Sequence, residues 1–123
     1  MKDIQDKADI RLLVDEFYDK VNQDRLLAPI FNEVAQVSWE THLPKMYDFW
    51  AKLLLGENAY KGSPFDKHLP LPIEGEHFDR WLHLFMQTLD EHFAGRKAEE
   101  ARLKAQSIAD IFRFKMKTLK TTS

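Results

Sequence analysis

Apolar residues recur at helical spacing along most of this 123-residue chain, and this periodicity is the strongest restriction on its fold. Residues 8–24 show it most clearly, since apolar side chains return there every three or four positions. Similar stripes follow in three later segments: from Ser38 or Thr41 to Gly56, residues 75–94, and residues 97–119. No segment reads as a competing strand. We therefore expect one all-α domain over residues 1–123.

Three polar side chains fall on these apolar stripes, namely Tyr18, His42 and Trp81. A hydroxyl, an imidazole or an indole N–H needs a hydrogen-bond partner when it is buried. For each residue that partner is either a nearby protein group or a bound ligand, and the periodicity leaves both alternatives open. The aromatic Phe31, in the short apolar turn after the first helix, is expected to be buried.

The start of the second helix is complicated by Pro44, two residues after His42. Proline in a helix interior costs roughly 3 kcal/mol, but in the first turn its missing N–H is no loss. Thr41 as the cap would place Pro44 at the third helical position. We expect an irregular start there.

The segment between Gly56 and Gly75 is too long for an idle connector in a compact domain, so it is expected to hold something. Its one short helical turn is started by a capping serine with a proline and stopped by two further prolines: Ser63, Pro64, Pro70 and Pro72. The residue on this turn with chemistry to offer is His68.

Composition excludes several classes of function. The net charge is −2 and no run of Lys and Arg occurs, so neither nucleic acid nor an anionic membrane is an expected partner. Cys is absent, which excludes disulfides, thiolate catalysis, iron–sulfur clusters and covalent haem attachment. The first residues lack an apolar signal core and no long apolar run follows, so we expect a cytoplasmic protein.

The histidines match no familiar metalloenzyme pattern. A His-Glu-x-x-His zinc motif is missing, and the one Glu-x-x-His pair, Glu74 and His77, has no second copy for a di-iron site. The histidines of the third helix lie off its apolar stripe and are expected to be solvated: His77, His83 and His92. Only His42 and His68 lie in apolar surroundings.

Haem is the cofactor that combines a single histidine ligand with an apolar, aromatic-rich pocket. Aromatic residues make up 12% of the chain, with nine Phe and three Trp. Because no Cys is present, such a haem would be a non-covalent haem b. A few polar donors would then be needed around the open position of the iron, and Tyr18, His42 and Trp81 are the candidates.

The ordered set of residues resembles the group III truncated haemoglobins over roughly residues 10–115. The matching pieces are Phe17-Tyr18, Pro29-Ile30-Phe31, His42 before Phe49-Trp50, Leu54-Leu55-Gly56, the stretch from Tyr60 through Gly62, Pro64 and His68 to Leu71-Pro72, and His77-Phe78 with Trp81-Leu82 and Leu84-Phe85. The resemblance implies a truncated globin fold, a two-on-two helical sandwich with a very short proximal helix.

The resemblance also implies roles for single residues. His68 would be the proximal iron ligand, while Tyr18 and Trp81 would donate hydrogen bonds to the distal ligand and His42 would act as a gate. The pocket walls would include Phe31, Met46 and Trp50. Basic or hydroxyl groups must hold the haem propionates, and the candidates near in sequence are Tyr60, Lys67 and Arg80.

The function implied is binding of O₂, NO or other small ligands at a polar distal site. Strong retention of O₂ suits redox chemistry, such as oxidation of nitric oxide to nitrate or peroxidase-like turnover, with an unidentified reductase as partner. Two alternatives stay open at this point. One is an O₂ or NO binding or sensing module without turnover, and the other is a helical interaction domain without a cofactor.

Overall fold

The computed structural model describes residues 1–57 and 74–122. In this part of the chain the elements are helical throughout: α1 (Lys7–Gln23), η1 (Ile30–Val34), α2 (Trp39–Leu55), α3 (Gly75–His92) and α4 (Arg96–Thr122). The all-α prediction is confirmed. The short helix expected around His68 lies outside the described residues.

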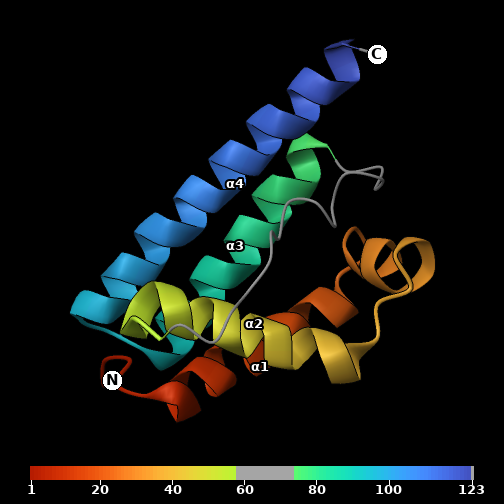
Figure 1. The fold of residues 1–123 in the computed structure, drawn as a ribbon. Helices are drawn as coiled ribbons and strands as arrows, with labels where there is room; N and C mark the ends of the chain where they lie inside the picture. The colour runs from red at the N-terminus through yellow and green to blue at the C-terminus, as the bar shows by residue number, and fades with distance from the viewer. Residues whose placement is uncertain (58–73, 123) are drawn as a thin grey trace.

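The four α-helices form two layers of two (Figure 1). In one layer α1 and α2 run antiparallel, and in the other α3 and α4 run antiparallel across them. Helix α1 packs against both α2 and α3, while α3 packs against α4. Helix α1 therefore connects the two layers.

Helix α1 forms because its start is capped and one face is apolar. The carboxylate of Asp6 accepts a hydrogen bond from the backbone N–H of Asp9 at 3.1 Å. The buried face carries the predicted stripe: Ile10, Leu13, Val14, Phe17, Tyr18 and Val21. These positions lie one above another at the helical period, so a single face can be buried against both neighbouring helices.

The turn after α1 is made by Asp24, whose carboxylate accepts hydrogen bonds from the backbone N–H groups of Leu26 and Leu27 at 3.1 and 3.0 Å. The chain then enters η1, a single π-helical turn whose N–H groups bond carbonyls five residues earlier. Phe31 in this turn is half-buried and packs against the core, so its burial is only partial and less than predicted. Its ring stacks on Trp39 at the edge of the core, at 5.8 Å and 27°.

Helix α2 begins at Trp39 with Ser38 in the capping position, which decides between the two expected caps, Ser38 and Thr41. The Thr41 backbone N–H and hydroxyl both donate to the Ser38 carbonyl at 3.1 Å, so the first turn forms earlier and is tight. Pro44 consequently lies inside the helix, on an exposed position. At the other end Gly56 adopts a left-handed φ of 75°, a conformation that favours glycine and ends the helix.

Helix α3 begins after Glu74, whose backbone N–H donates to Nδ1 of His77 at 2.9 Å. The Glu74–His77 pair is thus part of a helix start, as in a capping box, and not half of a di-iron site. His83 is exposed as predicted. His77 and His92 are half-buried, because His77 caps α3 and His92 lies 4.0 Å from the Glu16 carboxylate of α1.

The N-terminal segment holds the corner between α3 and α4. The carboxylate of Asp3 accepts hydrogen bonds from the backbone N–H groups of Lys97 and Ala98, both at 2.9 Å, and so caps α4 from the opposite end of the chain. Gly95 lies directly beside it with φ of 136°, and a Cβ there would come within 2.6 Å of Asp3. The capping position of Asp3 therefore requires a residue without a side chain at position 95.

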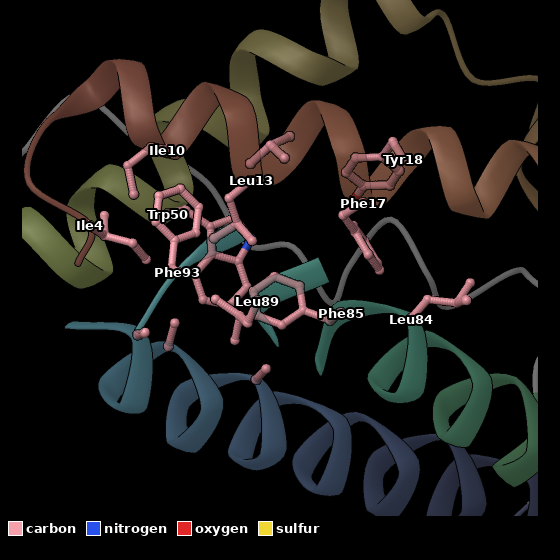
Figure 2. Close-up of a cluster of buried hydrophobic side chains, with 14 of the residues drawn as sticks. Ile4, Ile10, Leu13, Phe17, Tyr18, Trp50, Leu84, Phe85, Leu89 and Phe93 are labelled. Carbon is pink, nitrogen blue, oxygen red and sulfur yellow. The ribbon is translucent and has the colours of Figure 1, made fainter. Parts of the chain in front are cut away.

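The core lies where α1 crosses α3, and Figure 2 shows its buried side chains. Phe85 is at its centre and fully buried; its ring stacks on Trp50 of α2 at 4.7 Å and meets the edge of Phe17 of α1 at 5.4 Å. Truncating a buried phenylalanine costs about 3–5 kcal/mol, so Phe85 is a main contributor to the packing of three helices.

We expect Asp3→Ala to lower the free energy of unfolding by about 1–2 kcal/mol, because the first turn of α4 loses its cap. Burial raises the pKa of Asp3, but the N–H groups of Lys97, Ala98 and Ile4 outweigh it and the net pKa lies below its ordinary value. The cap is therefore at full strength above about pH 5 and is lost as the pH falls through the lowered pKa. Urea unfolding of both proteins at several pH values measures this.

Asp3→Asn is the matched control, since it keeps an acceptor oxygen without the charge. It should lose less stability than Asp3→Ala and show a flatter acid limb. An Asp3→Ala penalty that stays constant from neutral to strongly acidic pH would contradict the assigned cap.

Candidate functional site

Four rings gather where α1, η1 and α2 meet: Tyr18, Phe31, Trp39 and His42, here called the Tyr18 cluster. The rings of Tyr18 and His42 lie 5.2 Å apart and nearly perpendicular, at 83°. Trp39 meets both rings, Tyr18 at 5.3 Å and His42 at 5.5 Å. Two of the predicted site residues, on different helices, are thus brought into direct contact.

The polar centre of the cluster is the Tyr18 hydroxyl, which lies 3.3 Å from Nε2 of His42. Tyr18 is only 7% exposed, and burial raises the pKa of its phenol well above the ordinary value. A phenolate in this position would be poorly solvated, so the hydroxyl keeps its proton. The site therefore offers a neutral O–H donor surrounded by aromatic rings.

His42 is half-buried in the first turns of α2. Although α2 starts earlier than expected, His42 still faces Tyr18, since Pro44 occupies the solvent side of the helix. Pro44 therefore does not move the His42 imidazole away from Tyr18.

Trp81 reaches the same region from α3. Its indole stacks on Phe85 at 5.7 Å and 13°, and it meets the edge of Phe17 at 5.6 Å. Phe17 in turn contacts Tyr18 at 4.8 Å, so an unbroken series of rings joins Trp81 to the Tyr18 cluster. Within the described ranges no residue accepts a hydrogen bond from the Trp81 indole N–H, whereas Trp39 donates to Asn32 at 2.8 Å.

The predicted wall residues also lie in this region. Trp50 is 3% exposed and packs on Phe85 and on Phe49. Met46, one turn after His42 on α2, is half-buried against the core. The surroundings of the donors are therefore apolar, which strengthens any hydrogen bond made there.

The remaining predicted site residues are not brought into the cluster by the described structure. Arg80 is exposed on α3, and its guanidinium donates to the carboxylate of Asp24 at 3.0 Å. His68, Tyr60 and Lys67 lie outside the described residues.

Trp39 and Phe85 have no role in the site predicted from the sequence. The signal for Trp39 was its spacing, because a residue three positions before His42 shares its face of the helix. No such signal exists for Phe85, since its contacts with Trp50 and Trp81 join three separate helices.

Other kinds of site find little support in the described part of the chain. It contains no group of three His, Asp or Glu side chains able to hold a metal ion. None of its helices is long and apolar enough to cross a membrane.

The profile of the bacterial-like globin family matches residues 2–117. The chain belongs to this family. The group 3 truncated hemoglobin ctb of Campylobacter jejuni is 40% identical over 107 residues, 84% of each chain. The crystal structure of group III truncated hemoglobin from Campylobacter jejuni has a TM-score of 0.85 at 37% identity, covering 94% of this chain and 95% of that one. The group 1 truncated hemoglobin GlbN of Nostoc commune is 37% identical over 71 residues, 57% of this chain and 58% of its own.

These similarities confirm the resemblance to the group III truncated haemoglobins and the two-on-two fold. Membership of the globins implies haem-based binding of small ligands. The Tyr18 cluster of this globin suits such a role, because it places a protonated hydroxyl beside an imidazole among aromatic rings, and a series of ring contacts joins it to the Trp81 indole.

We expect the buried Tyr18 to be silent in an alkaline titration of the folded globin. Tyr18→Phe should leave the tyrosinate absorbance between about pH 9 and pH 11 unchanged, because Tyr18 stays protonated where an ordinary tyrosine ionises. The ionisation of Tyr47 also contributes little in this pH range, because burial and its bond to Asp15 raise its pKa to about 12. In urea the same substitution should remove one of three tyrosine signals. A loss of amplitude in the folded protein would contradict the buried, protonated hydroxyl.

Proposed function

We propose that this globin binds haem b non-covalently through His68 and holds O₂ or another diatomic ligand beside Tyr18 and Trp81. The observation that carries the proposal is the buried Tyr18 hydroxyl, which faces Nε2 of His42 at 3.3 Å within a wall of rings. Haem, when bound, would supply an iron that His68 would hold and that is able to bind a small ligand.

Tyr18 and Trp81 are the proposed donors to the ligand. The Tyr18 hydroxyl keeps its proton because the phenol is buried, and the Trp81 indole N–H has no acceptor among the described residues. A hydrogen bond to a charged acceptor contributes about 1.5–3 kcal/mol. Two such bonds slow the loss of a ligand that carries negative charge by roughly two to four powers of ten.

His42 is proposed to act as a gate through its bond with Tyr18. While the Tyr18 hydroxyl is engaged with Nε2 of His42, it is not aimed at a ligand. Movement of the imidazole frees the hydroxyl and opens a path beside α2. The Tyr18 oxygen would thus bond His42 while the site is closed and the ligand after the imidazole has moved.

The walls and the rim complete the proposed site. Phe31, Met46 and Trp50 would exclude water from the donors, so that their hydrogen bonds act in a medium of low dielectric constant. The propionates would be held by Arg80 together with Tyr60 and Lys67. For Arg80 this requires the guanidinium to share or exchange its bond with Asp24.

A site that retains O₂ this strongly suits chemistry on O₂ better than transport. We propose oxidation of nitric oxide by O₂ to nitrate, with electrons from an unidentified reductase in the cytoplasm, or peroxidase-like turnover. The alternative is binding or sensing without turnover. Mixing the O₂ form with NO decides between them: rapid loss of the O₂ spectrum with production of nitrate supports the enzyme, and slow loss supports the binding module.

Expression with haem available should yield a coloured protein with a Soret band that His68→Ala removes or strongly shifts. The physical reason is that His68 is the proposed single iron ligand from the protein. His83→Ala is the matched control, because His83 is an exposed histidine of α3, and its spectrum should equal that of the wild type. A folded, colourless wild type would support a helical interaction domain without a cofactor and would overturn the proposal.

Tyr18→Phe and Trp81→Leu should each raise the O₂ dissociation rate by about one to two powers of ten, since each removes one donor to the ligand. Stopped-flow displacement of O₂ by CO measures the rate. Tyr47→Phe is the matched control, because its hydroxyl bonds Asp15 between α1 and α2. Unchanged dissociation in both test variants would exclude these residues as ligand donors.

A further inference from the structure

Trp39 covers the pair formed by Tyr18 and His42. It lies three residues before His42 on α2, and its indole contacts the imidazole at 5.5 Å and 82°. The same indole contacts the Tyr18 ring at 5.3 Å and stacks on Phe31 of η1. An imidazole that leaves Tyr18 on this side must therefore displace the indole.

The indole is held in place by a series of hydrogen bonds. The Trp39 N–H donates to Oδ1 of Asn32 at 2.8 Å, and the Asn32 amide donates to Oδ1 of Asn22 at 2.8 Å. The Asn22 amide then donates to the backbone carbonyl of Tyr18 at 3.1 Å. The series crosses from α2 through η1 to α1.

The direction of this series is determined by its two ends. An indole N–H can only donate, so Asn32 must present its oxygen to Trp39 and its NH₂ group to Asn22. A backbone carbonyl can only accept, so Asn22 must present its NH₂ group to Tyr18. Each amide thus uses both of its polar ends, and successive bonds of one direction polarise one another.

The series begins at the Trp39 indole and ends at Tyr18, whose ring Trp39 also contacts. Its last acceptor is the Tyr18 carbonyl, while the Tyr18 hydroxyl meets the imidazole that Trp39 covers. The contacts form a closed circuit through three elements, and breaking any one bond loosens the position of the indole over His42.

We propose that Trp39, held by Asn32 and Asn22, sets how often His42 moves away from Tyr18 and so controls the rate at which small ligands reach the site. This inference rests on the proposed function as a haem protein with a ligand beside Tyr18. Trp39 is a positioning residue in this role, since it acts through His42.

The exposure of the Asn22 and Asn32 side chains suits their bonds to adjusting the position of His42 more than to stabilising the fold. Asn22 and Asn32 are exposed, so their bonds contribute little to the stability of the fold. A modest bond is nevertheless enough to shift a two-position equilibrium, because the loss of one ordinary hydrogen bond changes a population by about threefold to tenfold. The bonds are thus suited to adjusting an imidazole position.

The test is CO association after flash photolysis of the haem-loaded protein. Trp39→Phe keeps a ring but lacks the N–H, and Asn32→Ala keeps the indole but removes its acceptor. Both should raise the bimolecular association rate by about threefold to tenfold. Asn22→Ala, one bond further away, should raise it less. The matched control is Gln106→Ala, which removes an equally exposed amide bond, to Asp110 on α4, and should leave the rate unchanged.

A second readout does not depend on haem. In NMR spectra, the cross-relaxation between the Tyr18 and His42 rings should weaken in Asn32→Ala and persist in Gln106→Ala. A wild type without a Soret band overturns the proposed function. The inference about Trp39 is then tested by the Tyr18–His42 cross-relaxation alone. Equal association rates in wild type, Trp39→Phe and Asn32→Ala overturn it in the coloured protein, as does an unchanged ring contact in Asn32→Ala. Because Asn32 is exposed, that variant remains informative if Trp39→Phe does not fold.

Discussion

The contact of Phe17 with Phe85 and Trp81 is the interaction on which the rest of this globin depends. It sets where α1 crosses α3, because all three rings meet edge to face or stacked at 5.4 to 5.7 Å. Tyr18 is the next residue along α1, so its ring is turned by one helical step toward α2. One packing contact therefore aims a buried hydroxyl at His42.

Polar groups inside an apolar interior need partners, and the globin supplies them in two ways. At the helix ends, short-range pairs such as Glu74 with His77 satisfy the first N–H groups, and Asp3 does so for α4 from the far end of the chain. In the Tyr18 cluster the partner of the hydroxyl is the His42 imidazole. If His42 moves as proposed, the hydroxyl becomes available to a ligand in a way that a capped N–H is not.

Much of this arrangement could be predicted from residue spacing. The apolar stripes predicted the helices, and the polar residues on them, Tyr18 and His42, proved to be neighbours. Local rules left one point open and misjudged another. Either Ser38 or Thr41 could cap α2, and the tight Thr41 bonds to the Ser38 carbonyl decided in favour of the earlier start. His77 was expected in solvent because its role as a capping partner depends on the backbone direction before α3.

The sequence by itself determined the all-α class, the glycine that ends α2 and the identity of the polar residues on apolar faces, because each of these depends on neighbours within one or two turns. Only the tertiary structure decided which of those faces meet. The 3.3 Å approach of Tyr18 to His42, the stacking of Trp81 on Phe85 and the circuit from Trp39 to Asn22 each join separate elements. Such contacts follow from the crossing of packed helices, which no local spacing specifies.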